Sequence, residues 1–399
     1  MRIENRSLER QGGAATLLVT MVLLVAATLM VLYTSRALVG EQRMSANEMR
    51  ANQAFEAAQG GLELSIERVN ANKTFNAASV NGVWSSSNSS YTVAYCSTGT
   101  FPAAQQCADR SSGGITPACT APGAGDATAW VVACGWSDDN SARKRIVSFV
   151  AQSQPVPGTI ANPLTSHGAV TFSGNSTVVN YFNNLTVWTG NTLANTGNTG
   201  KTVIRRPTST AGALTSNQVD TEVGNGNQVC NTNQAPDLIC TTSTGVFGPD
   251  VIQSDSSLAG LTADQFFENF LGLPPTLYKA TEAKEVVAGA NAGTITDGGK
   301  VYWVDGNATI SQDIGSLEHP VVIVVDGDLT LSGNSTIFGI VFVKGNLATS
   351  GGPKIRGALL ATGDVNSAGA LNVIYDPEAI RNTKTLGTYA SAPGAWRDF

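Results

Sequence analysis

Charged side chains are scarce in this 399-residue sequence, at 14 % of residues, and aromatic side chains make up only 7 %. There is no basic stripe with interleaved aromatic residues, and the formal net charge is −6, so nucleic acid is not expected as a partner. The only histidines are His167 and His319, which leaves little material for histidine metal ligands or histidine-assisted catalysis. The GxSxG, HExxH and phosphate-binding-loop motifs are absent. We therefore expect no enzyme activity, no cofactor and no metal.

Glycine is abundant, with 42 residues, and serine, threonine and asparagine are frequent. Apolar residues still make up 42 % of the chain, which indicates a polar, uncharged, β-rich protein and not a disordered one. The length predicts two or three domains.

The N-terminus contains a long apolar run. Residues 14–33, AATLLVTMVLLVAATLMVLY, carry no charge, and as a helix they would rise about 30 Å, enough to cross a bilayer. Arg2, Arg6 and Arg10 precede the run and favour a cytoplasmic N-terminus. A simple signal anchor is the plainest interpretation. A cleaved signal peptide fits less well, because its apolar core would be shorter and would be followed by a small-residue cleavage site.

The helix is expected to continue past the membrane. No proline occurs from Thr34 to Asn70, and apolar residues recur there in steps of three and four, as on one face of an amphipathic helix. These residues are Ala51, Phe55, Ala58, Leu62, Ile66 and Val69. We predict one long helix over residues 14–70 that ends against a globular head, locally weakened or bent at Gly60 and Gly61.

The N-terminal region resembles that of PilX-type minor pilins of type IV pili. The resemblance rests on a short basic leader, a glycine pair, the uncharged run and the helix motif RMSANEMRANQAFEAAQGGLE, and it covers roughly residues 10–70. It implies that residues 1–13 are a prepilin-type leader, removed by prepilin peptidase after Gly13 to leave Ala14 as the new N-terminus. Cleavage after Gly12 is the alternative.

The resemblance also implies partners and a location. The partners would be other minor pilins, the major pilin, the inner-membrane pilus assembly platform, prepilin peptidase and, through residues 14–33, the lipid bilayer. The C-terminal region would lie in the periplasm before assembly and at the pilus or cell surface afterwards.

One position departs from the pilin pattern. Most pilins carry Glu at the fifth mature position, where this chain has Leu18, or Leu17 if cleavage follows Gly12. That Glu would supply an intersubunit charge pair, so its absence favours a rare subunit that starts, caps or primes the fibre.

Residues 71–153 are predicted to form a disulfide-bonded, pilin-like β head. Strand candidates lie at 90–96, 129–136 and 143–152, and the last two are joined by the turn sequence SDDNSA, which contains Asp138 and Asp139. Four cysteines in this exported region indicate two disulfides with three alternative pairings. Because Cys96 and Cys134 end adjacent strand candidates, we favour Cys96–Cys134 with Cys107–Cys119. A zinc site is disfavoured, since no CxxC spacing occurs.

Beyond a proline-rich linker at 154–163, residues 164–399 show a repeat. Gly327, Gly345 and Gly363 are spaced by 18 residues, and Gly306 lies 21 residues before the first. This period predicts a β-solenoid, a β-helix-like domain with glycine at corners that need positive φ. The predicted core residues are Val322, Val324, Ile340, Val343, Leu359 and Leu360.

The string SGNST occurs at both 173–177 and 332–336. We interpret it as corner chemistry, with Asn175 and Asn334 in equivalent turns and with Thr177 and Thr336 beginning the next strands. A ligand motif used twice is the alternative.

Residues 164–399 also contain segments and side chains that are not part of the repeat pattern. A helical insertion is predicted around 257–273, starting near Thr262 and carrying Phe266, Phe267, Phe270 and Leu271; it packs on the solenoid or binds in a groove. Cys230 and Cys240 are predicted to form a third disulfide, and YDPEAI at 375–380 a final short helix. Asp326, Asp328 and Asp364 are interpreted as solvated corner carboxylates, with a weak Ca²⁺ site as the less favoured alternative.

The expected fold is therefore an α+β pilin-like N-terminal part followed by a β-solenoid C-terminal domain. The expected function is that of a minor pilin-like subunit acting in type IV pilus assembly or initiation and displayed at the fibre tip. The alternative is a membrane-anchored β-helix protein that binds or cleaves carbohydrate at the cell surface.

Overall fold

The protein is described by a computed structural model, which divides into two compact units. It covers residues 12–72, 74–75, 80–83, 88–99, 101–109, 114–123, 125–196, 201–205, 238–241, 247–394 and 397–398. The helix unit comprises residues 1–151 and 389–399, and the parallel-sheet unit comprises residues 152–388.

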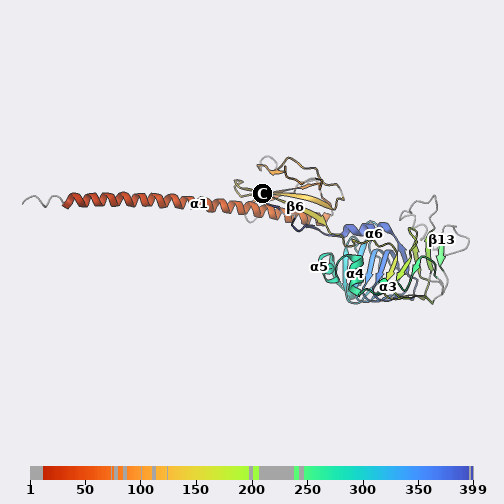
Figure 1. Cartoon of the computed structure of the whole chain (residues 1–399). Helices are drawn as coiled ribbons and strands as arrows, with labels where there is room; N and C mark the ends of the chain where they lie inside the picture. The colour runs from red at the N-terminus through yellow and green to blue at the C-terminus, as the bar shows by residue number, and fades with distance from the viewer. Residues whose placement is uncertain are drawn as a thin grey trace, which may run out of the picture. The chain divides into compact units, whose positions relative to one another are not determined.

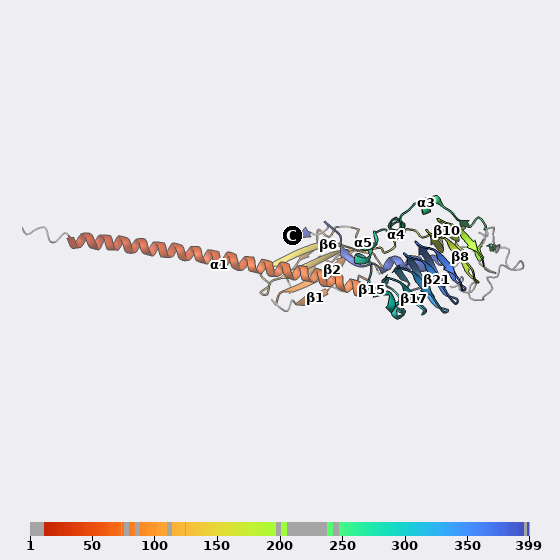
Figure 2. The ribbon, with the colours of Figure 1, turned by 90° about the horizontal axis from the view of Figure 1, so that it is seen from below.

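The helix unit is built on α1 (Gly12–Asn72), a single helix of 61 residues. Figure 1 shows it as one unbroken rod, so the glycine pair at 60–61 does not end it. The first part of the rod extends away from the sheet, and the last part lies along the sheet (Figure 2). The predicted long helix is thus present.

The sheet of the helix unit is antiparallel, in the order β1-β2-β5-β6-β25, with β26 also paired to β6. Its strands are β1 (Val80–Val83), β2 (Ser90–Cys96), β5 (Thr128–Trp136), β6 (Arg143–Gln152), β25 (Tyr389–Ser391) and β26 (Arg397–Asp398). A small hairpin joins β3 (Gln106–Cys107) to β4 (Ile115–Thr116). The three strands predicted between residues 90 and 152 are confirmed as β2, β5 and β6.

The domain boundaries differ from those predicted. The last residues, from Tyr389 on, belong to the helix unit, where β25 and β26 lie beside β6. The expected linker at 154–163 belongs to the parallel-sheet unit, because Val156 and Ile160 are buried in its core. The parallel-sheet unit is therefore inserted between two strands of the antiparallel sheet.

The parallel-sheet unit contains two large sheets. The twelve-stranded sheet comprises β7 (Leu164–Ser166), β9 (Thr177–Asn180), β10 (Val187–Thr189), β12 (Lys201–Arg205), β13 (Leu238–Thr241), β14 (Val251–Ile252), β15 (Glu285–Ala288), β16 (Val301–Asp305), β18 (Val321–Asp326), β20 (Thr336–Val343), β22 (Lys354–Ala361) and β24 (Asn372–Tyr375). The six-stranded sheet comprises β8 (Val170–Phe172), β11 (Leu193–Asn195), β17 (Ala308–Ile310), β19 (Leu329–Leu331), β21 (Leu347–Thr349) and β23 (Val365–Ser367).

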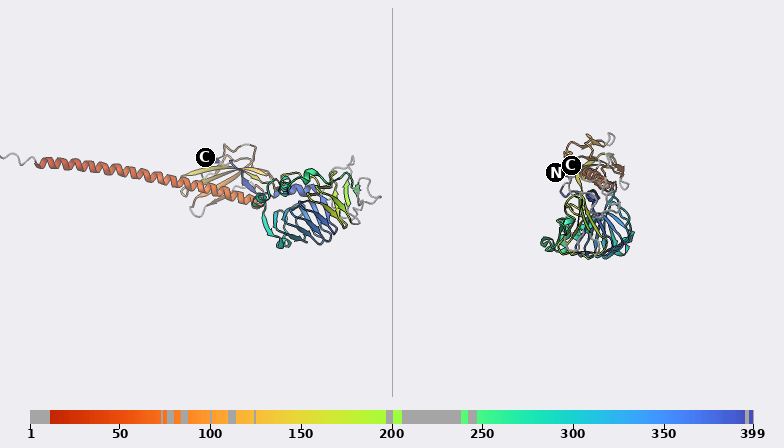
Figure 3. Two further views of the ribbon diagram at one scale, coloured as in Figure 1. Left: turned by 60° about the horizontal axis from the view of Figure 1, so that its bottom comes forward. Right: turned by 90° about the vertical axis from the view of Figure 1, so that its right-hand side faces the viewer.

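From β16 to β24 the chain alternates between the two sheets, and each strand pairs in parallel with the strand two places along. Register follows the repeat: Gly339 lies beside Gly357, and Leu329 beside Leu347. Figure 3 shows these strands lying side by side. Spatial order departs from chain order at one place, because the early strands β7, β8 and β9 pair with the late strands β22, β23 and β24.

The glycines of the predicted 18-residue repeat do stack. The amide of Gly345 donates to the carbonyl of Gly327 at 2.9 Å, and the amide of Gly363 donates to the carbonyl of Gly345 at 3.0 Å. The predicted reason for glycine was wrong: of the four glycines, only Gly306 has a positive φ. A Cβ on Gly345 would lie 2.6 Å from the carbonyl carbon of Gly327, so close backbone approach is what requires glycine here.

The repeated SGNST strings occupy equivalent turns, as predicted. A Cβ on Gly174 would collide with Gly369, one on Gly369 with Gly351, and one on Gly351 with Gly333. The two strings thus lie in one column of stacked turns, three steps apart. Thr177 and Thr336 begin β9 and β20.

The predicted core residues are buried, but they face two different layers. Val343 and Leu359 point between the sheets. Val322, Val324, Ile340 and Leu360 lie on the other face of the twelve-stranded sheet, against helices. These helices are α3 (Ser256–Ala259), α4 (Ala263–Leu271), α5 (Pro275–Thr281) and α6 (Pro377–Thr383), with the 3₁₀ helices η2 (Gly289–Thr294) and η3 (Lys384–Leu386) nearby in sequence.

The predicted aromatic helix is confirmed as α4. Thr262 caps it with a reciprocal side-chain and backbone pair with Gln265, and Gly272 ends it in the left-handed region at φ 79°. Phe266 and Phe267 are fully buried and pack on Phe342. The helix therefore covers the sheet with its aromatic face, and the alternative of a groove-binding aromatic helix is not needed.

Candidate functional site

The candidate functional site is α1. In its first part every apolar side chain from Leu17 to Tyr33 is exposed; Leu18 is 65 % exposed. This is the part of the described chain that is long and apolar enough to cross a membrane, and none of it is buried within the protein.

Two threonine hydroxyls of the apolar stretch donate to carbonyls of their own helix. Thr20 Oγ1 donates to the carbonyl of Leu17 at 2.9 Å, and Thr28 Oγ1 donates to the carbonyl of Val25 at 2.8 Å. A hydroxyl bonded to its own helix leaves no donor that needs water. The stretch therefore presents a surface suited to lipid or to other apolar helices.

The second part of α1 packs on the antiparallel sheet through small residues. Ala54, Ala57 and Ala58 are fully buried, and the backbone of β5 at Gly135 comes so close that a Cβ there would collide with the helix at Ala54. Gly61 plays the same part against Tyr91, whose ring would lie 2.8 Å from an added Cβ. Gly61 and Gly135 thus allow close packing of helix on sheet.

Polar contacts fix this packing at its ends. Tyr95 Oη donates to the carbonyl of Ser65 at 3.0 Å. Asn70 bonds the backbone of Tyr389 twice, accepting at 2.6 Å and donating at 2.9 Å, and so ties α1 to β25. Arg50 Nε lies 2.9 Å from Asp139 Oδ2.

Asp139 lies in the turn between β5 and β6, as predicted for a turn residue. It accepts from the hydroxyl of Ser141 at 2.6 Å and from that of Ser137 at 2.7 Å. These hydrogen bonds, more than the nearby guanidinium of Arg50, hold the pKa of Asp139 well below its usual range. The carboxylate is therefore a stable acceptor for Arg50.

The processing site remains a prediction. Residues 1–11 lie outside the described part of the chain, and Gly12, Gly13 and Ala14 are described only as helical backbone.

The disulfides differ from the favoured pairing. Cys96 is bonded to Cys119 and Cys107 to Cys134, with Cα–Cα distances of 5.4 and 5.6 Å. The pairing Cys96–Cys134 was wrong because of strand register: Cys96 lies opposite Trp130, and Cys134 opposite Thr92. Four residues along a strand span about 13 Å, which is beyond the reach of a disulfide.

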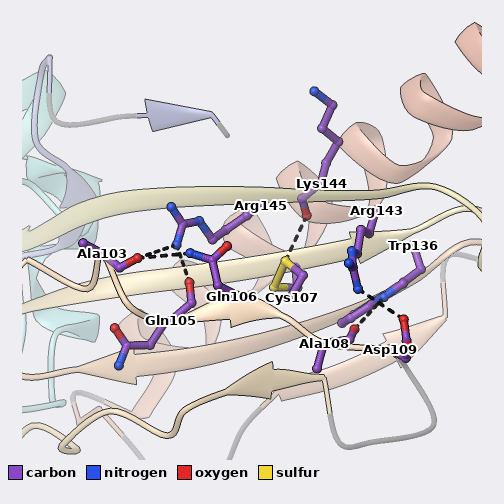
Figure 4. The surroundings of a disulfide bond; sticks show 11 residues. Ala103, Gln105, Gln106, Cys107, Ala108, Asp109, Trp136, Arg143, Lys144 and Arg145 are labelled. Carbon is purple, nitrogen blue, oxygen red and sulfur yellow. Dashed lines mark hydrogen bonds and ion pairs between the residues drawn. A yellow bond between two sulfur atoms is a disulfide. The ribbon is translucent and has the colours of Figure 1, made fainter.

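Cys107–Cys134 joins the β3 segment to the sheet. Figure 4 shows how its surroundings support it: Trp136 Nε1 donates to the carbonyl of Ala108 at 3.2 Å, and the Arg145 guanidinium donates to the carbonyls of Ala103 and Gln105. Burial lowers the pKa of Arg145. Beside Cys96–Cys119 lies a pocket of about 300 Å³ with no charged residue in its lining. The predicted Cys230–Cys240 bridge lies outside the residues whose side chains are described.

The aspartates considered for Ca²⁺ have other partners. Asp328 Oδ1 accepts from the amide of Asn346 at 2.7 Å, and Asp364 Oδ1 accepts from the amide of Ala169 at 2.8 Å. Asp326 pairs with Lys344 at 2.6 Å. Within the described ranges, no group of three or more His, Cys, Asp or Glu side chains is placed to hold a metal ion.

Asn and Asp side chains in fact form a ladder along one corner of the parallel-sheet unit. Asn307 Oδ1 accepts from the amide of Asp328, Asp328 Oδ1 from that of Asn346, and Asn346 Oδ1 from that of Asp364, at 2.7–2.9 Å. Along this ladder Asn and Asp side chains alternate, so an uncharged amide always separates two carboxylates. This ladder is structural, and only the spacing of the repeat signalled it in the sequence.

Comparison with known proteins gives one family match. The PilX N-terminal family model matches residues 12–63. No curated protein matches the chain.

Solved structures give only weak likenesses. An ice-binding protein from an Antarctic Flavobacteriaceae bacterium is 14 % identical, with a TM-score of 0.25 and coverage of 56 % of this chain and 51 % of that one. The competence-associated pilin ComZ from Thermus thermophilus is 8 % identical, with a TM-score of 0.21 and coverage of 88 % and 97 %. Neither likeness is close enough to carry a conclusion about fold or function.

The matched residues all lie in α1. They begin at Gly12 and Gly13, include the exposed apolar stretch, and end in the alanine-rich surface that packs on the sheet. By this match, residues 12–63 are similar to the N-terminal segment of PilX-type pilins.

Proposed function

We propose that this protein is a minor pilin-like subunit that acts in the assembly or initiation of type IV pili. The observation that carries the proposal is the division of α1 into an exposed apolar part and a part packed on an antiparallel sheet, within a segment that matches the PilX N-terminal family. A helix built this way can lie in the inner membrane before assembly and among the helices of other subunits afterwards.

In this proposal, prepilin peptidase removes the leader after Gly13, or after Gly12, and the assembly platform passes the subunit into the fibre. The other minor pilins and the major pilin are the partners of α1. The antiparallel sheet and the parallel-sheet unit then lie outside the inner membrane, in the periplasm first and at the cell surface later.

The parallel-sheet unit is proposed to be a β-solenoid displayed by the fibre. The supporting observations are the alternation of strands between two parallel sheets and the stacked glycine columns at the 18-residue repeat. Stacking of this kind buries a continuous core between neighbouring repeats.

A position at the fibre tip is proposed from Leu18. A subunit without a carboxylate near its N-terminus offers no acceptor to the N-terminal amine of a neighbour, and an unpaired buried charge is costly. Such a subunit suits an end position, where its own amine is paired and no neighbour needs its side chain.

The test is to produce the chain in a host that has prepilin peptidase and a pilus, to shear the fibres, and to examine both fractions by quantitative mass spectrometry. The proposal predicts a processed N-terminus and a few copies per fibre. A chain with an intact leader found only in the membrane would favour a plain anchor, and a copy number near that of the major subunit would exclude the tip.

A further inference from the structure

The pocket of about 300 Å³ beside the Cys96–Cys119 disulfide lies in the helix unit, on the side of the antiparallel sheet away from α1. Successive residues of a strand point to opposite faces of a sheet. In β5, Val131 and Ala133 pack toward α1, whereas Val132 packs with Cys96 and Cys119 on the other face. The long helix therefore does not cover the pocket.

The walls of the pocket are held in place by the protein itself. Next to the disulfide, the amide of Ser97 donates to the carbonyl of Thr120 at 2.8 Å. The guanidinium of Arg145 donates to the carbonyl of Ala103 at 3.2 Å and also to that of Gln105. These bonds fix the segment before a ligand arrives, so binding loses little conformational entropy.

Gln105 is the residue that points to a ligand. It lines the pocket and is only 9 % exposed, yet its side-chain amide makes no hydrogen bond with any residue in the described part of the chain. Figure 4 shows this amide pointing away from Arg145, which bonds only the backbone carbonyl of Gln105. A largely buried amide without a partner costs free energy, and a ligand that donates and accepts hydrogen bonds would recover it.

The rest of the lining defines the chemistry of that ligand. None of the lining residues is charged, so a charged ligand would lose its hydration without gaining a counter-charge. Ser97 and Thr120 add hydroxyl groups, which both donate and accept. Phe101 adds an apolar ring, held by an edge contact to Trp130 with 5.0 Å between ring centroids. The lining thus combines neutral hydrogen-bonding groups with one apolar surface.

We propose that this pocket binds one neutral sugar ring. A sugar carries hydroxyl groups that match the amide and hydroxyl side chains, and apolar C–H faces that match an aromatic ring. The volume lies at the lower end of the range of about 300–1,000 Å³ for ligand pockets, which favours a single ring over a longer chain. The proposal goes beyond the function proposed above and does not depend on it.

A peptide is the competing ligand, because its backbone amides could also bond Gln105. An extended peptide is usually bound along a groove or a free strand edge, where its main chain pairs over several residues. A small pocket closed by a disulfide and a proline offers no such length. A single compact ring fits these walls better.

The experiment measures ligand binding to the full chain in detergent by saturation-transfer NMR. The probes are methyl β-D-glucopyranoside, methyl β-D-galactopyranoside and the disaccharide methyl β-D-lactoside, with glucuronic acid and trialanine as charged and peptide comparisons. At least one neutral glycoside should receive saturation at its ring protons, and the two comparison compounds should not. Binding of the lactoside would identify the ligand as the end of a glycan, and binding of monosaccharides alone would identify it as a free sugar.

Substitutions then locate the binding. Gln105→Leu removes the amide at similar volume and should weaken binding about tenfold. Its thermal stability should not fall, because an amide without a partner in the described structure is replaced by an apolar group. Thr120→Val, at an exposed residue, should weaken binding several-fold without affecting folding. Gln59→Leu is the matched control: Gln59 is exposed on α1, outside the pocket, and its replacement should leave the affinity unchanged.

Three results would overturn the proposal. The first is that none of the neutral glycosides binds. The second is that a glycoside binds Gln105→Leu and Thr120→Val as tightly as it binds the unchanged chain, with both disulfides intact by peptide mapping. The third is that trialanine or glucuronic acid binds in place of the sugars. None of these results bears on processing or fibre entry, so the proposed function would be tested separately.

Discussion

Replacing Gly345 by alanine should destabilise the parallel-sheet unit, even though its φ is not in the left-handed region. The added Cβ would lie 2.6 Å from the carbonyl carbon and 2.7 Å from the carbonyl oxygen of Gly327. Ordinary contact begins at 3.4 Å, so the two backbones must separate by roughly 0.8 Å or the strands must tilt.

Separation would stretch the bonds that join the repeats at this corner. The amide of Gly345 donates to Gly327 at 2.9 Å, and the neighbouring amide of Asn346 donates to Asp328 at 2.7 Å. Overpacking of this kind costs about 1–3 kcal/mol, and weakening one hydrogen bond adds about 1 kcal/mol. We expect a loss of about 2–4 kcal/mol in the free energy of unfolding of this unit.

The assay is urea unfolding of the full chain in detergent, with hydrogen exchange of the amides of residues 346 and 364 as a local readout. Gly293→Ala is the matched control, because nothing lies within 4 Å of its added Cβ and its φ is ordinary. The control should be neutral or slightly stabilising. If Gly345→Ala were no more destabilising than Gly293→Ala, close stacking would not be the reason for glycine at this corner.

The other predictions concern the ladder of Asn and Asp side chains, the buried carboxyl group of Glu282, the two disulfides and Leu18. Asn346→Asp places three carboxylates in adjacent rungs, so thermal stability should fall and should recover in part at high salt; an effect independent of salt would contradict charge repulsion. Burial raises the pKa of Glu282, which accepts from Ser153 Oγ at 2.8 Å, so the folded state holds this proton more tightly than the unfolded state. Its contribution to stability is then full below the unfolded pKa and is lost as pH rises through the folded pKa. Glu282→Gln should therefore remove a fall in the free energy of unfolding between about pH 4 and pH 7. If the dependence of that free energy on pH were unchanged in the variant, the assignment to Glu282 would be refuted. Proteolytic mapping without reduction should yield peptides joined through Cys96–Cys119 and Cys107–Cys134, and a Cys96–Cys134 peptide would contradict the register of β2 and β5. Leu18→Glu should be inserted normally but should change the abundance or position of the subunit in sheared fibres; an unchanged copy number would remove the basis for an end position.

Local patterns predicted much of this fold from the sequence. The uncharged run and the apolar steps of three and four predict α1, and alternation with turn residues predicts β2, β5 and β6. Thr262 and the residues that follow it predict α4, because a cap and an aromatic face are local features. The 18-residue interval predicts stacked glycines, since equal spacing returns the chain to the same corner.

Long-range features were not predictable in the same way. The disulfide pairing depends on the register in which β2 pairs with β5, and the turn sequences do not determine that register. The pairing of β7 with β22 joins residues about 195 positions apart, and no local signal selects that partner. The helices α4 and α6 cover one face of the larger sheet, so its strands are apolar on both faces and their pattern cannot identify the inner face.

For the N-terminal site, the sequence predicted which residues of α1 are apolar but not how α1 packs on the sheet. Exposure of Leu17 to Tyr33 follows from composition, but close packing at Gly61 and Gly135 requires knowing which strand lies under the helix. Gly60 and Gly61 were expected to weaken α1, and the packing role of Gly61 became visible only against Tyr91.

The most direct test of the central claim is the identity of the first residue of the chain in isolated surface fibres. Mass spectrometry of the N-terminal peptide should show a chain that begins at Ala14, or at Gly13, in the fibre fraction and at a few copies per fibre. A chain that keeps Met1 and its leader, and that stays in the membrane fraction while fibres form normally, would contradict the account.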